Sequence, residues 1–240
     1  MPAMTPAPKP AIQPVQRPPC LIRAHLILTG LLLCLCLLAP QAALAGAWPR
    51  GKGNNFATST LRVALSQTGE LSRSFSYFHE YGLTDRLTLT GDMGGAISGL
   101  DKLVLYLSVP LPDLWGVALA FDMGGGTIAG QQVLRPGLSF GRGLQRPSGW
   151  ISGELVAEVY PETGALDWKF DTTFGLSPGE RAKYYVQLQT GQRQGDLPFA
   201  RLAGSAAIRL RPGLFLDIGG SAGLANTDPY RVKLGIWKEF

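Results

Sequence analysis

Cysteine is scarce in this 240-residue chain, and its three copies, Cys20, Cys34 and Cys36, all lie within the first 45 residues. The rest of the chain therefore has no thiol with which to form a disulfide, bind a metal or attack a substrate. Histidine is equally rare, since His79 is the only one after residue 45. No Cys/His metal motif and no phosphate-binding glycine motif occurs. We expect neither a metal nor another cofactor.

Acidic residues are missing from the first 45 positions. The basic residues Lys9, Arg17 and Arg23 precede an apolar run over 26–38, and small residues follow at 43–45. This order is typical of a secretory signal peptide. The apolar run is shorter than the about 20 residues of a membrane-spanning helix. We predict that residues 1–45 are a signal peptide, cleaved after Ala45, and that residues 46–240 form the mature domain.

A strong charge of either sign is also missing from residues 46–240. Three of the 22 Lys and Arg residues belong to the leader, whereas all 17 Asp and Glu residues follow it. The mature domain is therefore close to neutral, and it has no basic tract with interleaved aromatic residues. These features exclude nucleic acid as an expected partner.

A helical repeat is absent after residue 45, where apolar residues recur at every second position instead. Near the end of the chain, Val232, Leu234 and Ile236 share one face, while Arg231 and Lys233 share the other. This period is typical of a strand between an apolar and a polar environment. Twelve such segments occur, and the length of each is close to the roughly 9–11 residues of a tilted transmembrane strand. They are 55–67, 73–83, 86–94, 102–111, 115–125, 133–143, 151–160, 166–176, 181–193, 199–211, 214–224 and 230–240.

The connections between these segments alternate in character. Tight Pro, Gly and Asp sequences such as 177–180 alternate with looser ones such as 194–198. An even number of antiparallel strands places both chain ends on the side of the tight turns, as in outer-membrane barrels. We therefore predict an all-β domain, a single closed antiparallel transmembrane β-barrel of about 12 strands. Its expected location is the outer membrane of a Gram-negative bacterium, in contact with outer-membrane lipid.

The final strand carries a resemblance to a known class. Its residues Val232, Leu234, Ile236 and Phe240 resemble the assembly signal of bacterial outer-membrane barrels, whereas Lys238 departs from that pattern, which more often has an aromatic residue there. The resemblance implies recognition by periplasmic chaperones and the barrel-assembly machinery. The stretches 47–53 and 80–86 look like those of loosely related proteobacterial barrels described as transporters or phenol-degradation outer-membrane proteins.

The strand alternation divides the notable side chains between two faces. On the lipid side, an aromatic girdle is expected from Tyr77, His79, Tyr81, Trp115, Trp168, Tyr184 and Tyr230. On the inner side, a basic wall is expected from Arg62, Lys183, Arg193, Arg201, Arg209, Arg211, Arg231 and Lys233. An acidic wall is expected opposite, from Glu80, Asp92, Asp122, Glu154, Glu158, Asp167 and Asp171.

These faces favour a narrow porin-like channel for small polar or anionic solutes, and not an enzyme. Arg201, Arg209, Arg231 and Lys233 are expected to set an anion preference. Two alternatives stay open. A lipid-face or surface enzyme of the phospholipase or lipid A deacylase type would depend on His79, and a structural barrel without transport would have its interior filled by salt bridges. Many inner positions are small and no loop is long enough for a plug, which favours the open pore.

Overall fold

The computed structural model describes residues 46–240, so the predicted signal peptide lies outside the described residues. Every regular element there is a β-strand, and no helix between residues 46 and 240 is long and apolar enough to cross a membrane. The strands are β1 (Asn55–Leu65), β2 (Leu71–Gly82), β3 (Thr88–Ala96), β4 (Lys102–Leu114), β5 (Val117–Ile128), β6 (Gln131–Gln145), β7 (Ser148–Tyr160), β8 (Ala165–Leu176), β9 (Ala182–Gln192), β10 (Phe199–Arg211), β11 (Leu214–Ala225) and β12 (Tyr230–Glu239).

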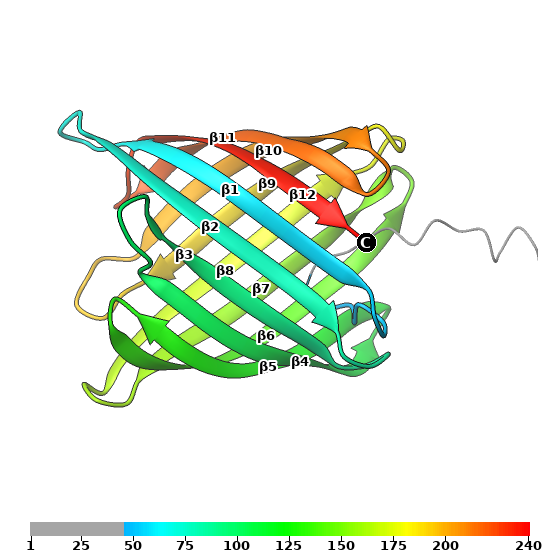
Figure 1. The fold of residues 1–240 in the computed structure, drawn as a ribbon, viewed down its shortest axis with the longest axis horizontal. Helices are drawn as coiled ribbons and strands as arrows, with labels where there is room; N and C mark the ends of the chain where they lie inside the picture. The colour runs from blue at the N-terminus through cyan, green and yellow to red at the C-terminus, as the bar shows by residue number, and fades with distance from the viewer. Residues whose placement is uncertain (1–45) are drawn as a thin grey trace, which may run out of the picture. The chain divides into compact units, whose positions relative to one another are not determined.

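Each strand pairs antiparallel with its neighbours in the chain, and the first strand pairs with the last (Figure 1). The register between β1 and β12 runs from Phe56 opposite Glu239 to Leu65 opposite Tyr230. No strand edge is left open along this closed sheet, which removes the surface through which extended sheets associate. The prediction of a closed, antiparallel 12-stranded barrel is confirmed.

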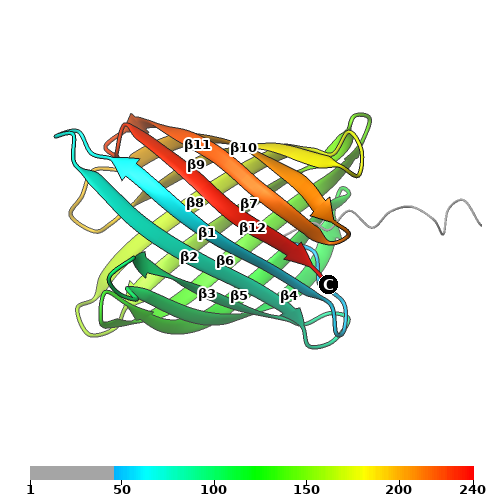
Figure 2. The same ribbon diagram turned by 45° about the horizontal axis from the view of Figure 1, so that its top comes forward.

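The two ends of the barrel differ in their connections (Figures 1 and 2). One end, called the tight-turn end here, carries both the segment preceding β1 and the C-terminus, together with the connections 83–87, 115–116, 146–147, 177–181 and 212–213. The opposite loop end carries 66–70, 97–101, 129–130, 161–164, 193–198 and 226–229. The alternation expected from the sequence is therefore present, although the connections at both ends are short.

The turn between β4 and β5 corrects one strand boundary. Trp115 was expected to open the fifth strand, but it lies in a two-residue turn with Gly116 and is 88% exposed. Both residues have positive φ, 51° for Trp115 and 75° for Gly116, as in the hairpin turns whose twist matches that of the strands. A register irregularity between Leu111 and Leu114 lets β4 extend to this turn.

The outer face of the barrel is apolar over its full circumference. Along β4, Leu103, Leu105, Leu107 and Val109 are exposed, whereas Val104 and Tyr106 between them are buried in the interior. The same alternation places Val232, Leu234 and Ile236 of β12 outside. An apolar surface of this extent on a soluble monomer would be exceptional. On a transmembrane barrel it is the surface that contacts hydrocarbon.

A matched pair of substitutions tests which surface faces the membrane. Leu107→Arg places a charge midway along β4, whereas Leu197→Arg places the same charge in the exposed loop 193–198. We expect Leu107→Arg to lower the free energy of unfolding in lipid by about 2–4 kcal/mol and Leu197→Arg to lower it by about 0–1 kcal/mol. Denaturant titration of both variants in vesicles measures this, and equal losses would contradict a hydrocarbon-facing β4.

Part of the barrel interior is an aromatic core. At the tight-turn end, Phe56, Ala207, Phe215 and Trp237 form a buried cluster against which Phe78 and Tyr185 pack. The rings of Phe56 and Trp237 meet edge to face, with centroids 5.3 Å apart. A second cluster on the opposite wall contains Val104, Tyr106, Val133 and Tyr160. These residues lie at inward positions of their strands. Their large side chains make the lumen narrower than small polar side chains at the same positions would.

Candidate channel interior

The basic side chains of β9, β10, β12 and β1 point into the barrel, where several meet acidic partners from the same wall. Lys233 Nζ lies 2.7 Å from Asp217 Oδ2 and 2.6 Å from the Tyr185 hydroxyl. Lys183 Nζ lies 2.8 Å from Glu239 Oε1 and stacks over the rings of Phe215 and Trp237. Two of the predicted basic residues are thus neutralised locally.

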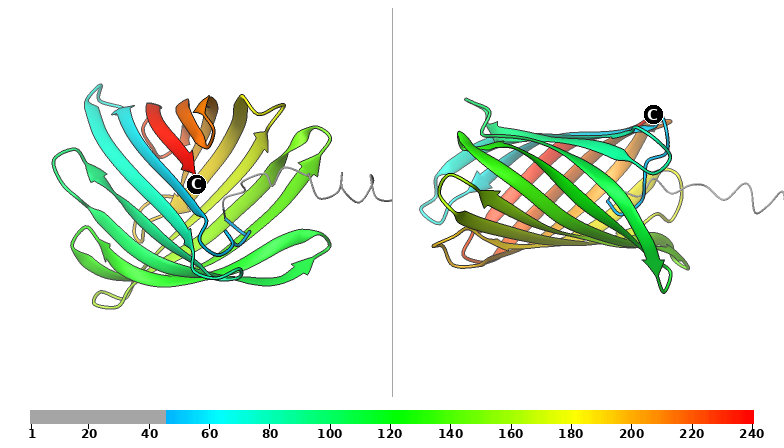
Figure 3. Two further views of the ribbon diagram at one scale, coloured as in Figure 1. Left: turned by 45° about the vertical axis from the view of Figure 1, so that its right-hand side comes forward. Right: turned by 90° about the horizontal axis from the view of Figure 1, so that it is seen from below.

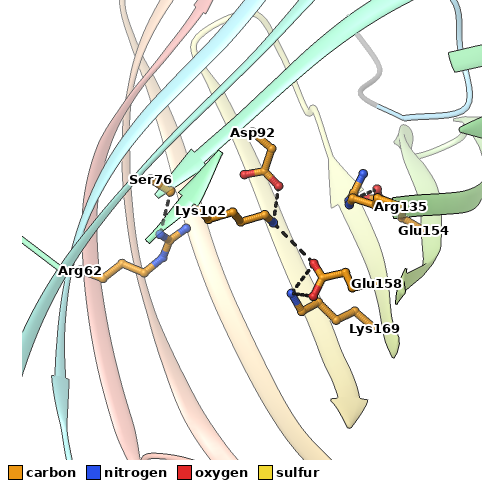
Figure 4. A network of polar contacts seen from close by, with 8 residues as sticks. All are labelled: Arg62, Ser76, Asp92, Lys102, Arg135, Glu154, Glu158 and Lys169. Carbon is orange, nitrogen blue, oxygen red and sulfur yellow. Dashed lines mark hydrogen bonds and ion pairs between the residues drawn. The ribbon is translucent and has the colours of Figure 1, made fainter. Parts of the chain in front are cut away.

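Acidic side chains of β3 and β7 are neutralised in the same local way (Figure 4). Lys102 lies 2.5 Å from Asp92 and 3.9 Å from Glu158, and Lys169 lies 2.8 Å from Glu158. Arg135 pairs with Glu154 at 2.8 Å. Three of these ion pairs join neighbouring strands, whereas the pair of Lys102 and Glu158 joins β4 to β7, which are not adjacent in the sheet. The transverse field expected from two fully charged walls is therefore much reduced, and the residual charges decide the electrostatics of the lumen.

Two interior arginines keep a charge with no carboxylate partner among residues 46–240. Arg62 donates to the Ser76 hydroxyl at 2.8 Å (Figure 4). Arg201 donates to the Thr227 hydroxyl and, at 3.4 Å, to Gln189. Both arginines therefore contact neutral groups only, which leaves this side of the lumen positive.

Residual carboxylates lie on the other wall. Asp122 is buried and accepts a hydrogen bond from Ser139 at 2.7 Å. Asp167 accepts from the backbone N–H of Gln194 at 2.8 Å. Asp171 faces the same interior space as Asp122. The described interior thus has a positive region and a negative region, each smaller than the wall predicted from the sequence.

Three of the predicted basic residues lie away from the middle of the lumen. Arg193 follows the last residue of β9 and belongs to the loop 193–198. Arg209 lies near the tight-turn end of β10 and pairs with the exposed Glu180 at 2.7 Å. Arg211 is the exposed last residue of β10. Arg209 lies far along the barrel from Arg201 and Arg231, with which it was expected to set the anion preference. Arg62, which lines a cavity together with those two residues, takes its place in the set considered below.

Three cavities follow one another along the lumen. A vestibule of about 630 Å³ at the loop end is lined by basic and acidic residues, among them Arg193, Arg201, Arg231, Asp167 and Asp228. A middle cavity of about 70 Å³ shares Arg201 and Arg231 with this vestibule. An inner cavity of about 140 Å³ shares Gln187 with the middle cavity and continues to Gly46. The middle cavity is the smallest of the three and is called the constriction here.

The amino-terminal segment, defined here as residues 46–54, places Ala47, Trp48 and Arg50 in the interior at the tight-turn end, whereas residues 52–54 are exposed. Ala47 is 1% exposed, and the Trp48 ring packs directly on Gly141, leaving no space there for a Cβ atom. Arg50 forms an ion pair with Glu80 in which both side chains are buried, and its guanidinium lies 4.3 Å from the centre of the Phe56 ring. These contacts hold the segment against β1, β2 and β6. Glu80 lines the inner cavity, but its carboxylate is paired with Arg50 of this segment.

The position of this segment inside the barrel differs from the expectation of an unplugged lumen, which rested on the connections between strands alone. One signal was present: Trp48 and Arg50 are a large aromatic and a charged residue beside Gly51 and Gly53, just before the first strand. The two glycines adopt positive φ, 76° and 83°, which lets the chain reverse between the lumen and β1. Such a reversal is visible at the start of the blue segment in Figure 3.

The aromatic side chains assigned to the girdle lie at both ends of the outer face. His79, Tyr81 and Tyr184 lie toward the tight-turn end, with Trp115 in the turn itself, and Trp168 and Tyr230 lie at the loop end. Tyr77 lies near the middle of β2. A role as membrane-interface anchors stays a prediction for all of them.

His79 is the residue on which the enzyme alternative depends. Its Nε2 lies 3.0 Å from the amide oxygen of Asn55, and its ring stacks on Phe240 at 6.4 Å. A hydrolytic site would instead pair the imidazole with a hydroxyl nucleophile and orient it by a third group. Between residues 46 and 240, no three His, Cys, Asp or Glu side chains are grouped to hold a metal ion. The geometry around His79 suits an anchoring side chain.

Comparisons with known proteins agree with this description of the fold. No protein-family model matches the chain, and a comparison with curated proteins returns no match. Among solved structures, the NanC porin matches with a TM-score of 0.61 at 7% identity, covering 78% of this chain and 100% of its own. An outer-membrane channel from Pseudomonas putida F1 matches with a TM-score of 0.60 at 12% identity, covering 83% and 100%. The KdgM porin matches with a TM-score of 0.55 at 8% identity, covering 76% and 99%.

These matches show the class of fold. The chain has the fold of small outer-membrane β-barrel channels, as the terminal strand and the period-two pattern indicated. Identities this low establish no shared solute.

Proposed function

We propose that the protein is a narrow channel for small anionic solutes in the outer membrane of a Gram-negative bacterium. The observation that carries the proposal is the constriction, where Arg62, Arg201, Arg231 and Lys233 line one cavity. Of these four, only Arg231 and Lys233 have carboxylate partners within residues 46–240, namely Asp228 and Asp217, so the constriction keeps an excess positive charge. Fixed positive charge in a narrow, water-filled passage raises the local concentration of anions and repels cations.

One structural neighbour supports this class of solute. The KdgM porin has also been crystallised in complex with disordered oligogalacturonate, a carboxylated oligosaccharide. Its barrel shares the fold but only 8% of the sequence of this chain. The comparison therefore supports passage of acidic solutes through such a barrel, and the choice of solute here rests on the residues of this constriction.

Conduction also requires movement of the amino-terminal segment. The inner cavity ends at Gly46, and Ala47 and Arg50 are buried against the barrel wall beyond it. We propose that this segment closes the lumen at rest and opens it when residues 46–52 leave the interior. The vestibule at the loop end stays accessible in both states, because none of its lining residues belongs to the segment.

The outer surface of the barrel is proposed to contact membrane lipid, and the last strand to contact the assembly machinery. Val232, Leu234, Ile236 and Phe240 are exposed on the outer side of the barrel, so along the strand they form one apolar face that we propose a chaperone or an assembly factor recognises before the barrel closes. Lys238, which departs from the usual pattern, places its ammonium group 4.1 Å from the centre of the Phe240 ring. Its charge is therefore partly accommodated by the terminal aromatic residue.

Solute release from proteoliposomes tests the channel proposal. Vesicles containing the refolded mature chain are loaded with glucuronate or with glucose, two solutes of similar size that differ by one carboxylate. We expect glucuronate to leave faster than glucose, because the constriction is positive. A barrel without transport would release neither solute, and faster release of glucose would contradict an anion-selective constriction.

A further inference from the structure

The middle cavity is small and shares lining residues with a larger space on each side. Its volume is about 70 Å³, and it lies between the vestibule of about 630 Å³ and the inner cavity of about 140 Å³. About 10–15 Å³ of such space is enough to hold one water molecule. The cavity therefore has room for a polyatomic ion or a charged substituent of that size, but not for a whole hydrated oligosaccharide.

The cations around this cavity are incompletely neutralised by the protein. Arg231 binds Asp228 through Nε at 3.0 Å and through a terminal nitrogen at 2.7 Å, and Lys233 binds Asp217 at 2.7 Å. Arg62 and Arg201 have only neutral contacts among residues 46–240. Their two charges remain without a counter-ion inside the barrel.

Arg201 is the most informative of these residues. Its side chain contacts two spaces, the vestibule and the middle cavity, and the residue is 6% exposed. Its Nε is buried and has no hydrogen-bond partner in the described part of the chain. A buried guanidinium that has an unused hydrogen-bond donor and no carboxylate partner lowers stability unless an anion or an ordered water molecule accepts that hydrogen bond.

We infer that the middle cavity is a binding site for one small oxyanion, which can be the carboxylate of an organic solute, a phosphate or a sulfate. The inference rests on the proposed channel function and adds to it a discrete, saturable site. Arg62 and Arg201 supply planar guanidinium donors that match oxyanion geometry, and Gln189 and Ser221 supply neutral polar groups at the cavity wall. An anion crossing the constriction exchanges hydration water for these donors.

Calorimetric titration of the refolded mature chain tests the site without relying on conduction. In an uncharged detergent and a buffer low in chloride, we titrate acetate, inorganic phosphate and sulfate in separate experiments. At least one of the three is expected to bind saturably with one site per barrel and to be displaced by the others. Tighter acetate binding assigns the site to carboxylated solutes, and tighter phosphate or sulfate binding assigns it to inorganic oxyanions. Absence of saturable binding for all three overturns the inference.

Matched variants connect the binding to the cavity. Arg201→Gln and, independently, Arg62→Gln are expected to weaken binding at least about tenfold, because each removes a charged hydrogen-bond donor. Arg209→Gln removes an inward arginine that does not line this cavity and is expected to bind as the wild type does. Heat-dependent gel mobility confirms that each variant is folded. Equal weakening in all three variants would show a general charge effect and refute the site.

The outcome separates this inference from the channel proposal. Anion-selective flux without saturable binding would overturn the site and leave the channel standing. Saturable binding without any flux would support the binding site and overturn the channel proposal.

Discussion

Removal of residues 46–52, with the leader joined directly to Gly53, is expected to raise the mean conductance of the barrel several-fold. The deleted residues include Ala47 and Trp48, which are packed inside the barrel, and Arg50, which is paired with Glu80. The first strand begins only at Asn55, so the barrel's hydrogen-bonded pairs are all retained. Planar-bilayer recording of the shortened and full-length mature chains measures the difference.

Two single substitutions control for the deletion. Arg50→Gln breaks the ion pair with Glu80 and is expected to increase the time spent in the conducting state. Lys52 is exposed and forms no ion pair with the described residues. The Lys52→Gln variant removes this neighbouring charge and is therefore expected to behave as the wild type. If the shortened chain conducts no better than the full-length chain, the amino-terminal segment does not close the lumen.

Neutralisation of the constriction in the quadruple variant Arg62→Gln, Arg201→Gln, Arg231→Gln and Lys233→Gln is expected to reverse ion selectivity from anions to cations. The substitutions remove the positive charges that line the constriction and leave Asp217 and Asp228, the partners of two of them, unpaired. The charge in and beside the constriction therefore changes from a positive to a negative excess. Charge of one sign at a narrow passage determines which ions enter it. The reversal potential under a salt gradient is the measurement.

The control for this prediction is a double variant outside the constriction. Arg209→Gln with Arg211→Gln removes two predicted basic residues at the tight-turn end of β10, one paired with Glu180 and the other exposed. We expect it to retain anion selectivity. If the double variant loses selectivity while the quadruple variant keeps it, the selective region lies at the tight-turn end and not at the middle cavity.

The strands could be predicted because their signal is local. Alternation of side chains between the faces of a strand follows from backbone geometry, and a lipid environment on one side makes the pattern readable without knowledge of pairing. Boundaries were less accurate where hairpin geometry determined them, as at Trp115, which adopts positive φ in a turn and does not begin β5.

The interior could be predicted only in part because its contacts join distant residues. Face parity predicts which side chains point inward, among them Arg62, Lys233 and Asp122, but it does not predict which of these side chains pair with each other. Asp217 and Lys233 come from paired strands, and their ion pair neutralises part of the basic wall locally. The amino-terminal segment shows no alternation of apolar and polar residues. Its position in the lumen depends on contacts of Trp48 with Gly141 and of Arg50 with Glu80, which form only in the folded barrel.

The most direct test of the whole account is single-channel recording of the refolded mature chain under a potassium chloride gradient. A closed barrel with a positive constriction predicts discrete openings whose reversal potential is shifted from zero toward the equilibrium potential of chloride. A folded protein that gives no openings, with or without residues 46–52, or openings selective for potassium, would contradict it.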